Sequence, residues 1–209
     1  MDRLKTLFEQ NANWSERVQK QDPDFFTTLV KQQNPEYLWI GCADSRVPAN
    51  EIVDLLPGEL FVHRNIANVV VHTDLNCLSV IQYAVDVLKV KHILVVGHYD
   101  CGGIKAALSN VDHGLIDNWL RHIKDVYRYH QDELDQLEDG EEKVNRLCEL
   151  NVVEQVSNVC HTTIVQSAWK RGQELTVHGW VYSLADGKLK DMQLCITGQD
   201  QLADSHKLG

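Results

Sequence analysis

The sequence predicts an α/β protein with a mostly parallel central β-sheet flanked by helices, an N-terminal helical arm and a C-terminal hairpin. Continuous apolar runs such as Ile93–Val96 are typical of parallel strands covered on both faces. Between these runs lie segments in which apolar residues recur at helical spacing. Near the end of the chain, two alternating stretches flank Asp186-Gly187, a dipeptide that favours a tight hairpin turn.

We expect a single domain over residues 1–209, with a helical arm over 1–34 and an α/β core over 35–200. This length is sufficient to bury a core without disulfide bonds. In the arm, Asp22-Pro23 is a cap followed by proline at the first position of a second amphipathic helix. The apolar face of that helix consists of Phe25, Phe26, Leu29 and Val30.

The core begins with a predicted strand over 37–41, followed by a helix-like turn to Leu56 and a second strand over 59–64. A capped helix over 73–88 then leads to a third strand over 92–97. We expect the crossover between these strands to be right-handed. In open α/β sheets, ligands bind beyond the carboxyl ends of the strands, which predicts where a site would lie.

The rest of the chain is predicted to be helical first and extended afterwards. Residues 114–161 are mostly helical, and a further helix covers 162–171. Two alternating strands follow over 174–184 and 189–196, and the polar tail from residue 197 is expected to fray.

The net charge and the distribution of apolar residues indicate which partners and which location to expect. The net charge is −10 and the isoelectric point is near 5.4, which disfavours nucleic acid and anionic membranes as partners. We therefore expect a small-molecule substrate. The sequence shows no secretion signal and no apolar run of membrane-spanning length, so we expect a cytoplasmic protein.

Six cysteines would stay reduced in the cytoplasm, which leaves metal binding, catalysis or core packing as their roles. Core burial is the expectation for Cys77, Cys148 and Cys160, which lie in helical patterns, and for Cys195, which lies in a strand pattern.

The other two cysteines follow predicted strands. His98 and Cys101 lie on a glycine-containing turn after the strand over 92–97, and Cys42 and Asp44 follow the first strand. Thiolate and imidazole ligands suit zinc, and the matched strand ends predict one site. The alternative is a buried Cys42, a core histidine and a surface pair of Asp44 with Arg46.

Asp44 has two possible roles at such a site. As a fourth ligand it would close the site, so that no water could be activated. Arg46, two residues on, offers Asp44 a charge-assisted partner instead. With Arg46 holding Asp44, water or hydroxide would occupy the fourth position and attack an electrophile.

Three motifs carry a family resemblance: GCADSRVP at 41–48, HRNIAN at 63–68 and GHYDCGG at 97–103. Together they resemble the β-class carbonic anhydrases, over about residues 11–196. The resemblance implies an enzyme with one Zn²⁺ per chain that hydrates CO₂ to bicarbonate and a proton. It also implies homodimers or homotetramers (dimers of dimers) with each active site at a subunit interface.

The resemblance also implies roles for individual residues. Cys42, His98 and Cys101 match the zinc ligands. Asp44 and Arg46 match the catalytic dyad that gates the fourth position, where Asp44 accepts a hydrogen bond from zinc-bound hydroxide. The backbone amide of Gly102 would face the substrate. The positions that match the lining of the CO₂ pocket are Gln33, Phe61, Ile66 and Tyr83.

Trp39, Arg64 and Tyr182 match a triad that resembles the bicarbonate-inhibited, allosteric type of bacterial β-carbonic anhydrase. In that type, bicarbonate bound beside the zinc favours the closed position of the aspartate, and Val47 lies where the loop would shift. The alternative is that Trp39 and Tyr182 pack in the core while Arg64 makes a structural ion pair.

The sequence departs from the family at Ala43, where serine is usual, and in its short C-terminus. It does not choose a proton shuttle among four histidines, which are His63, His72, His113 and His122.

Other functions remain open or are disfavoured. A closed structural zinc site and a hydrolase of CS₂ or COS would need the same ligands. A zinc deaminase and a dithiol redox protein are disfavoured, because their His-x-Glu, Pro-Cys-x-x-Cys and Cys-x-x-Cys motifs do not occur.

Overall fold

The computed structural model describes residues 3–31, 33–138 and 140–208 and divides the chain into two compact units, Met1–Asn34 and Pro35–Gly209. Within the described residues, no helix is long and apolar enough to cross a membrane.

The N-terminal unit consists of two helices, α1 (Arg3–Gln21) and α2 (Phe25–Lys31). The ring of Trp14 in α1 meets the ring of Phe26 in α2 edge to face, with the ring centroids 5.7 Å apart. Val30, predicted on the apolar face, is instead 87% exposed, because α2 presents Phe26 to α1. The two helices were predicted, but this part of the apolar face was wrong.

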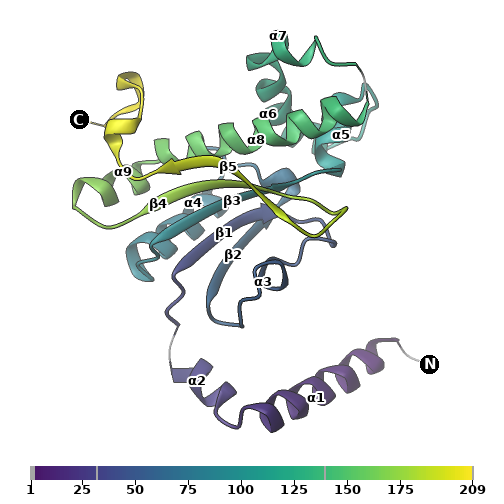
Figure 1. The fold of residues 1–209 in the computed structure, drawn as a ribbon, viewed down its shortest axis with the longest axis vertical. Helices are drawn as coiled ribbons and strands as arrows, with labels where there is room; N and C mark the ends of the chain where they lie inside the picture. The colour runs from purple at the N-terminus through teal and green to yellow at the C-terminus, as the bar shows by residue number, and fades with distance from the viewer. Residues whose placement is uncertain (1–2, 32, 139, 209) are drawn as a thin grey trace. The chain divides into compact units, whose positions relative to one another are not determined.

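The core unit is built on a five-stranded sheet in the order β2-β1-β3-β4-β5 (Figure 1). Its strands are β1 (Tyr37–Cys42), β2 (Leu60–Asn65), β3 (His92–His98), β4 (Thr176–Tyr182) and β5 (Leu189–Ile196). Strands β1 to β4 pair in parallel, and β5 pairs with β4 in antiparallel orientation. The predicted fold class, including the C-terminal hairpin, is confirmed.

Helices follow the strands in the predicted order. They are α3 (Ala49–Ile52), α4 (Leu75–Gln82), α5 (Gly102–Leu108), α6 (Ile116–Tyr129), α7 (Gln131–Leu134), α8 (Glu141–His161) and α9 (Thr163–Lys170). The short segments are η1 (Ile66–Asn68), η2 (Tyr83–Val87), η3 (Gln199–Gln201) and η4 (Asp204–His206). The single helix predicted over 73–88 is an α-helix up to Gln82 and then the π-helical turn η2.

Alternation along the strands sends side chains to two apolar layers. Leu38 and Ile40 of β1 join the main core, to which α4, α8 and α9 contribute. Trp39 points to the other face and packs with Leu94 and Val96 of β3. Helix α8 lies across β3 and β4 (Figure 1). The inner strands are therefore apolar on both faces, as their continuous apolar runs predicted.

The register of the parallel strands brings their carboxyl ends to one edge. Gly41 of β1 pairs with Val96 of β3, so Cys42 and His98 end neighbouring strands. On the far side of β3, His98 pairs with Tyr182, the last residue of β4. This edge of the sheet therefore collects the loops on which the sequence predicted a site.

Two predictions near the C-terminus were wrong. Cys195 is exposed rather than buried, because its neighbours Leu194 and Ile196 take the inward positions of β5. The polar tail is held in place: Gln166 of α9 donates to the carbonyl of His206 at 2.8 Å and accepts from the amide of Leu208 at 2.8 Å.

The close approach of α8 to the sheet requires Gly97. A Cβ at this position would lie 2.6 Å from Val152 Cγ2 of α8. We expect Gly97→Ala to reduce the free energy of unfolding by about 1–3 kcal/mol, because overpacking displaces the helix. Denaturant unfolding measures the change, with Gly102→Ala as control because an added Cβ there meets no atom within 4 Å. A Gly97→Ala variant as stable as the wild type would contradict this packing.

Candidate metal centre

Cys42, His98 and Cys101 come together at the carboxyl edge of the sheet. Cys42 ends β1, His98 ends β3, and Cys101 directly precedes α5. Between the last two, Asp100 has φ of 60°, a left-handed conformation that turns the chain back toward the cluster. One ligand atom from each of the three residues lies within 4.8 Å of the others, and all three residues are buried.

The spacing of these atoms fits a tetrahedral metal. The sulfur atoms of Cys42 and Cys101 are 4.0 Å apart. Two thiolates on one zinc, each at about 2.3 Å with a tetrahedral angle, would be about 3.8 Å apart. The donor set of two sulfurs and one imidazole nitrogen suits zinc.

The imidazole of His98 is oriented for a ligand. Its Nδ1 donates to the carbonyl of Tyr99 at 2.9 Å, so the neutral ring carries its proton there and leaves the Nε2 lone pair free. Among the described residues, Nε2 of His98 has no hydrogen-bond partner, although it is buried. A buried acceptor without a partner is costly, and a cation at this position would satisfy it.

The thiols of Cys42 and Cys101 act on each other. Their mutual hydrogen bond lowers the pKa of Cys42 and raises the pKa of Cys101, while burial disfavours the charged form of both. A divalent cation between the sulfurs would favour the thiolate form of both residues.

Asp44 lies beside the cluster and is held by Arg46. Nε of Arg46 donates to Oδ1 of Asp44 at 3.0 Å, Nη2 donates to Oδ2 at 2.7 Å, and the backbone amide of Arg46 donates to Oδ1 at 2.9 Å. The Arg46 guanidinium holds the pKa of the Asp44 carboxyl well below its usual range. Oδ2 of Asp44 is 3.8 Å from Nε2 of His98, so the carboxylate borders the cluster while it is paired with Arg46.

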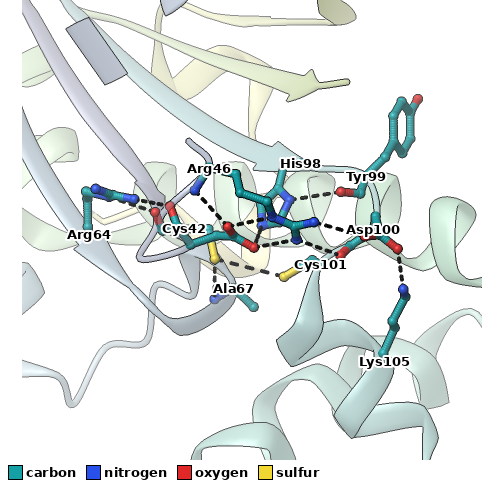
Figure 2. Close-up of polar contacts among 10 residues, drawn as sticks. Cys42, Arg46, Arg64, Ala67, His98, Tyr99, Asp100, Cys101 and Lys105 are labelled. Atoms are coloured by element: carbon teal, nitrogen blue, oxygen red, sulfur yellow. Dashed lines mark hydrogen bonds and ion pairs between the residues drawn. The ribbon is translucent and has the colours of Figure 1, made fainter. Parts of the chain in front are cut away.

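The loop that carries Cys42 and Asp44 is fixed from two sides. Arg64 of β2 donates through Nε to the carbonyl of Cys42 at 2.8 Å and through Nη2 to the carbonyl of Asp44 (Figure 2). The amide of Ala67 donates to the sulfur of Cys42 at 3.4 Å. The HRNIAN segment therefore supports the ligand loop through backbone contacts.

The amino-terminal end of α5 lies next to the cluster. A Cβ at Gly103 would lie 2.9 Å from Cγ2 of Ile66, so α5 packs closely on η1. By contrast, no atom lies within 4 Å of a Cβ built at Gly102. The backbone of Gly102 therefore has open space beside it.

Only part of the predicted CO₂ pocket is brought to this place. Ile66 adjoins Gly103, as described above, and is 38% exposed. The rings of Phe61 and Tyr83 pack against each other with centroids 5.9 Å apart, and Phe61 packs on the main core rather than on the layer around Cys42. Gln33 belongs to the N-terminal unit.

Two residues of the predicted bicarbonate triad share an apolar layer, and the third, Arg64, lies at the ligand loop. Trp39 is fully buried, and Tyr182 packs against the same layer. The backbone carbonyl of Tyr182 also accepts from the amide of Tyr99 at 3.0 Å. Arg64 contacts the carbonyls of the ligand loop and has no acidic side-chain partner among the described residues.

A second group of potential ligands consists of His63, Asp74 and Cys77. Asn65 donates its amide hydrogens to the carbonyl of Val69 at 2.7 Å and to Nε2 of His63 at 3.3 Å. Nε2 therefore acts as an acceptor, and the neutral ring of His63 carries its proton on Nδ1. Since Asp74 also caps α4 by accepting from Asn76, this group is less suited to a cation than the first.

The four candidate proton shuttles differ in their contacts. His63 is only 6% exposed, and burial lowers its pKa. His72 Nε2 lies 3.0 Å from the carbonyl of Asn158. His113 pairs with Asp117, and His122 packs edge to face on Trp119.

A cavity of 1130 Å³ lies beside the cluster rather than at it. Tyr99, Asp100 and Lys105 line it together with residues of α6 and α8, but the three clustered residues do not. Asp100 also contacts Arg46 and Lys105, a role that sequence reasoning missed. The only signal was a carboxylate between two predicted ligands in GHYDCGG.

Comparisons with known proteins agree with this geometry. The sequence profile described as "Carbonic anhydrase" matches residues 37–189. A carbonic anhydrase of Emericella nidulans is 54% identical over 202 residues, which cover 97% of this chain and 88% of that protein. A carbonic anhydrase of Saccharomyces cerevisiae is 33% identical over 195 residues, covering 90% and 87% of the two chains.

Solved structures share the fold over nearly the whole chain. The Coccomyxa β-carbonic anhydrase in complex with acetazolamide is 42% identical with a TM-score of 0.92, covering 96% of this chain and 90% of that one. One of two tetrameric β-carbonic anhydrases from Sordaria macrospora is 39% identical with a TM-score of 0.89, covering 94% and 100%. The chain therefore belongs to the carbonic anhydrase family, in its β class.

Proposed function

We propose that Cys42, His98 and Cys101 hold a zinc ion and that CO₂ is hydrated to bicarbonate and a proton beside it. The observation that carries this proposal is the buried Nε2 of His98, which lacks a hydrogen-bond partner among the described residues. It lies within 4.8 Å of two thiols and beside a carboxylate held by Arg46. Bound zinc would supply a Lewis acid that lowers the pKa of a water ligand.

Asp44 and Arg46 would determine whether water can occupy the fourth ligand position of the zinc. Because Arg46 makes three hydrogen bonds to the Asp44 carboxylate, the carboxylate is held as an acceptor and not released toward the cluster. With zinc bound, Asp44 in this position would orient the water by accepting a hydrogen bond from it. This pairing favours an enzyme over a closed structural zinc site.

The substrate would lie between the amide of Gly102 and an apolar wall. Open space at Gly102 and the exposed side chain of Ile66 support this placement. CO₂ has little capacity for hydrogen bonding, so an apolar lining suits it. We assign Phe61, Tyr83 and Gln33 to the same pocket, with some of these residues reaching it from a neighbouring subunit.

We further propose a homodimer or a dimer of dimers that works in the cytoplasm. The tetrameric relative from Sordaria macrospora supports such an assembly. The dimer and the tetramer would differ in mass by a factor of two, which light scattering resolves.

Bicarbonate inhibition through Trp39, Arg64 and Tyr182 is part of the proposal. Arg64 contacts the carbonyls of Cys42 and Asp44, so an anion that drew Arg64 away would loosen the loop that carries Asp44. The relatives named above are fungal and algal, so the bacterial character of this type remains a prediction.

One test of the proposed function changes the Asp44 carboxylate. In zinc-loaded Asp44→Asn, CO₂ hydration between pH 6.5 and 9 should fall by roughly 100-fold. The amide is uncharged and has one acceptor oxygen, so it cannot both pair with Arg46 and accept a hydrogen bond from the water as the carboxylate does. Stopped-flow assays measure the rate, and Asp54→Asn, which changes an exposed carboxylate, should keep wild-type activity. Wild-type protein with full zinc and no hydration at pH 9 would refute the proposed function.

A separate prediction concerns the inhibition of CO₂ hydration by bicarbonate. With increasing bicarbonate, the hydration rate should fall cooperatively, and its pH dependence should be steeper than a single-proton curve. Tyr182→Phe, which removes one hydroxyl from the triad, should weaken this inhibition several-fold. Non-cooperative inhibition on a single-proton curve in the wild type would remove the regulatory proposal and leave the hydration activity intact.

A further inference from the structure

Arg46 is bound by two carboxylates that come from two different ligand loops. Asp44 follows Cys42 in the sequence. Asp100 lies between His98 and Cys101 (Figure 2). Nη1 of Arg46 donates to Oδ2 of Asp100 at 3.2 Å, and Nη2 lies 3.5 Å from the carbonyl of Asp100. The guanidinium therefore joins the loop after β1 to the loop after β3.

The two carboxylates do not compete for the same donors. Asp44 uses the edge of the guanidinium formed by Nε and Nη2, whereas the carboxylate of Asp100 uses Nη1. A guanidinium has five N–H donors in a fixed plane, so both contacts form at once. Asp100 therefore fixes the position of Arg46 without withdrawing it from Asp44.

Asp100 is itself fixed. Its Oδ1 accepts from Nζ of Lys105 in α5, which leaves Oδ2 for Arg46 (Figure 2). Its φ of 60° is a conformation that glycine adopts freely and that aspartate and asparagine tolerate. The backbone alone therefore does not require an acidic residue here.

We propose that Asp100 is a positioning residue that anchors Arg46 and thereby keeps Asp44 away from the metal. This inference rests on the proposed function, in which Asp44 either pairs with Arg46 or closes the fourth position. When Asp100 is lost, Arg46 gains side-chain freedom and its pairing with Asp44 weakens. Asp44 then occupies the metal position in a larger fraction of molecules.

The expected effect is moderate because the contact is partly exposed. The side chains of Arg46 and Asp100 are 50% and 52% accessible, so solvent screens their interaction. We expect the ratio of open to closed sites to fall about threefold in Asp100→Asn, and further in Asp100→Gly.

Two measurements test the proposal on metal-loaded protein. In zinc protein labelled with ¹⁵N-arginine, the Nε–H group of Arg46 should be rigid in the wild type, and its order parameter should be lower in both variants. In cobalt-substituted protein, azide binding followed by the visible spectrum should weaken in Asp100→Asn, by up to about threefold where closed sites predominate. The apparent affinity and kcat/KM should fall by the same factor, because both scale with the open fraction.

Asp54→Asn is the matched control, since Asp54 has a similar left-handed φ of 53° and an exposed side chain. It should leave both readouts at wild-type values. A rigid Arg46 in Asp100→Asn and Asp100→Gly would overturn the anchoring role, and unchanged azide affinity would overturn the effect on Asp44. A wild-type cobalt protein that does not respond to azide would instead refute the open position, and with it the proposed function.

Discussion

The site depends on the convergence of two buried thiols and one buried imidazole at neighbouring strand ends. The parallel pairing of β1 with β3 places Cys42 beside the end of β3, and the left-handed turn at Asp100 returns Cys101 to the same point. The resulting group contains a buried acceptor, Nε2 of His98, that no described residue satisfies. A thiophilic divalent cation is the partner that satisfies this nitrogen and both sulfurs together.

Around this centre, charge determines what the site can do. Two thiolates would neutralise a divalent cation, so a carboxylate ligand would add a net negative charge and remove the open position. Arg46 binds the Asp44 carboxylate at the side of the cluster and so competes with the cation for it. Arg64 and Ala67 hold the same loop through its backbone and the sulfur of Cys42. Under the proposed function, the strand ends would hold the metal, and the Asp44–Arg46 pair would control the fourth position.

Much of this arrangement could be predicted from the sequence. Continuous apolar runs predicted parallel strands, and ligand-type residues after two of them predicted the cluster. The contact of Asp44 with Arg46 depends on side-chain geometry that spacing does not give. The exposure of Cys195 depended on which face of an alternating strand turns inward. The contact of Asp100 with Arg46 joins residues 54 positions apart, and no local pattern indicated it.

The central claim is that one zinc ion is bound by two sulfurs and one imidazole with a position left for water. X-ray absorption spectroscopy at the zinc edge tests it most directly. The account predicts two sulfur neighbours at about 2.3 Å, one imidazole nitrogen at about 2.0–2.1 Å and one oxygen. A zinc shell with fewer than two sulfurs, or with a third sulfur in place of the oxygen, would contradict it.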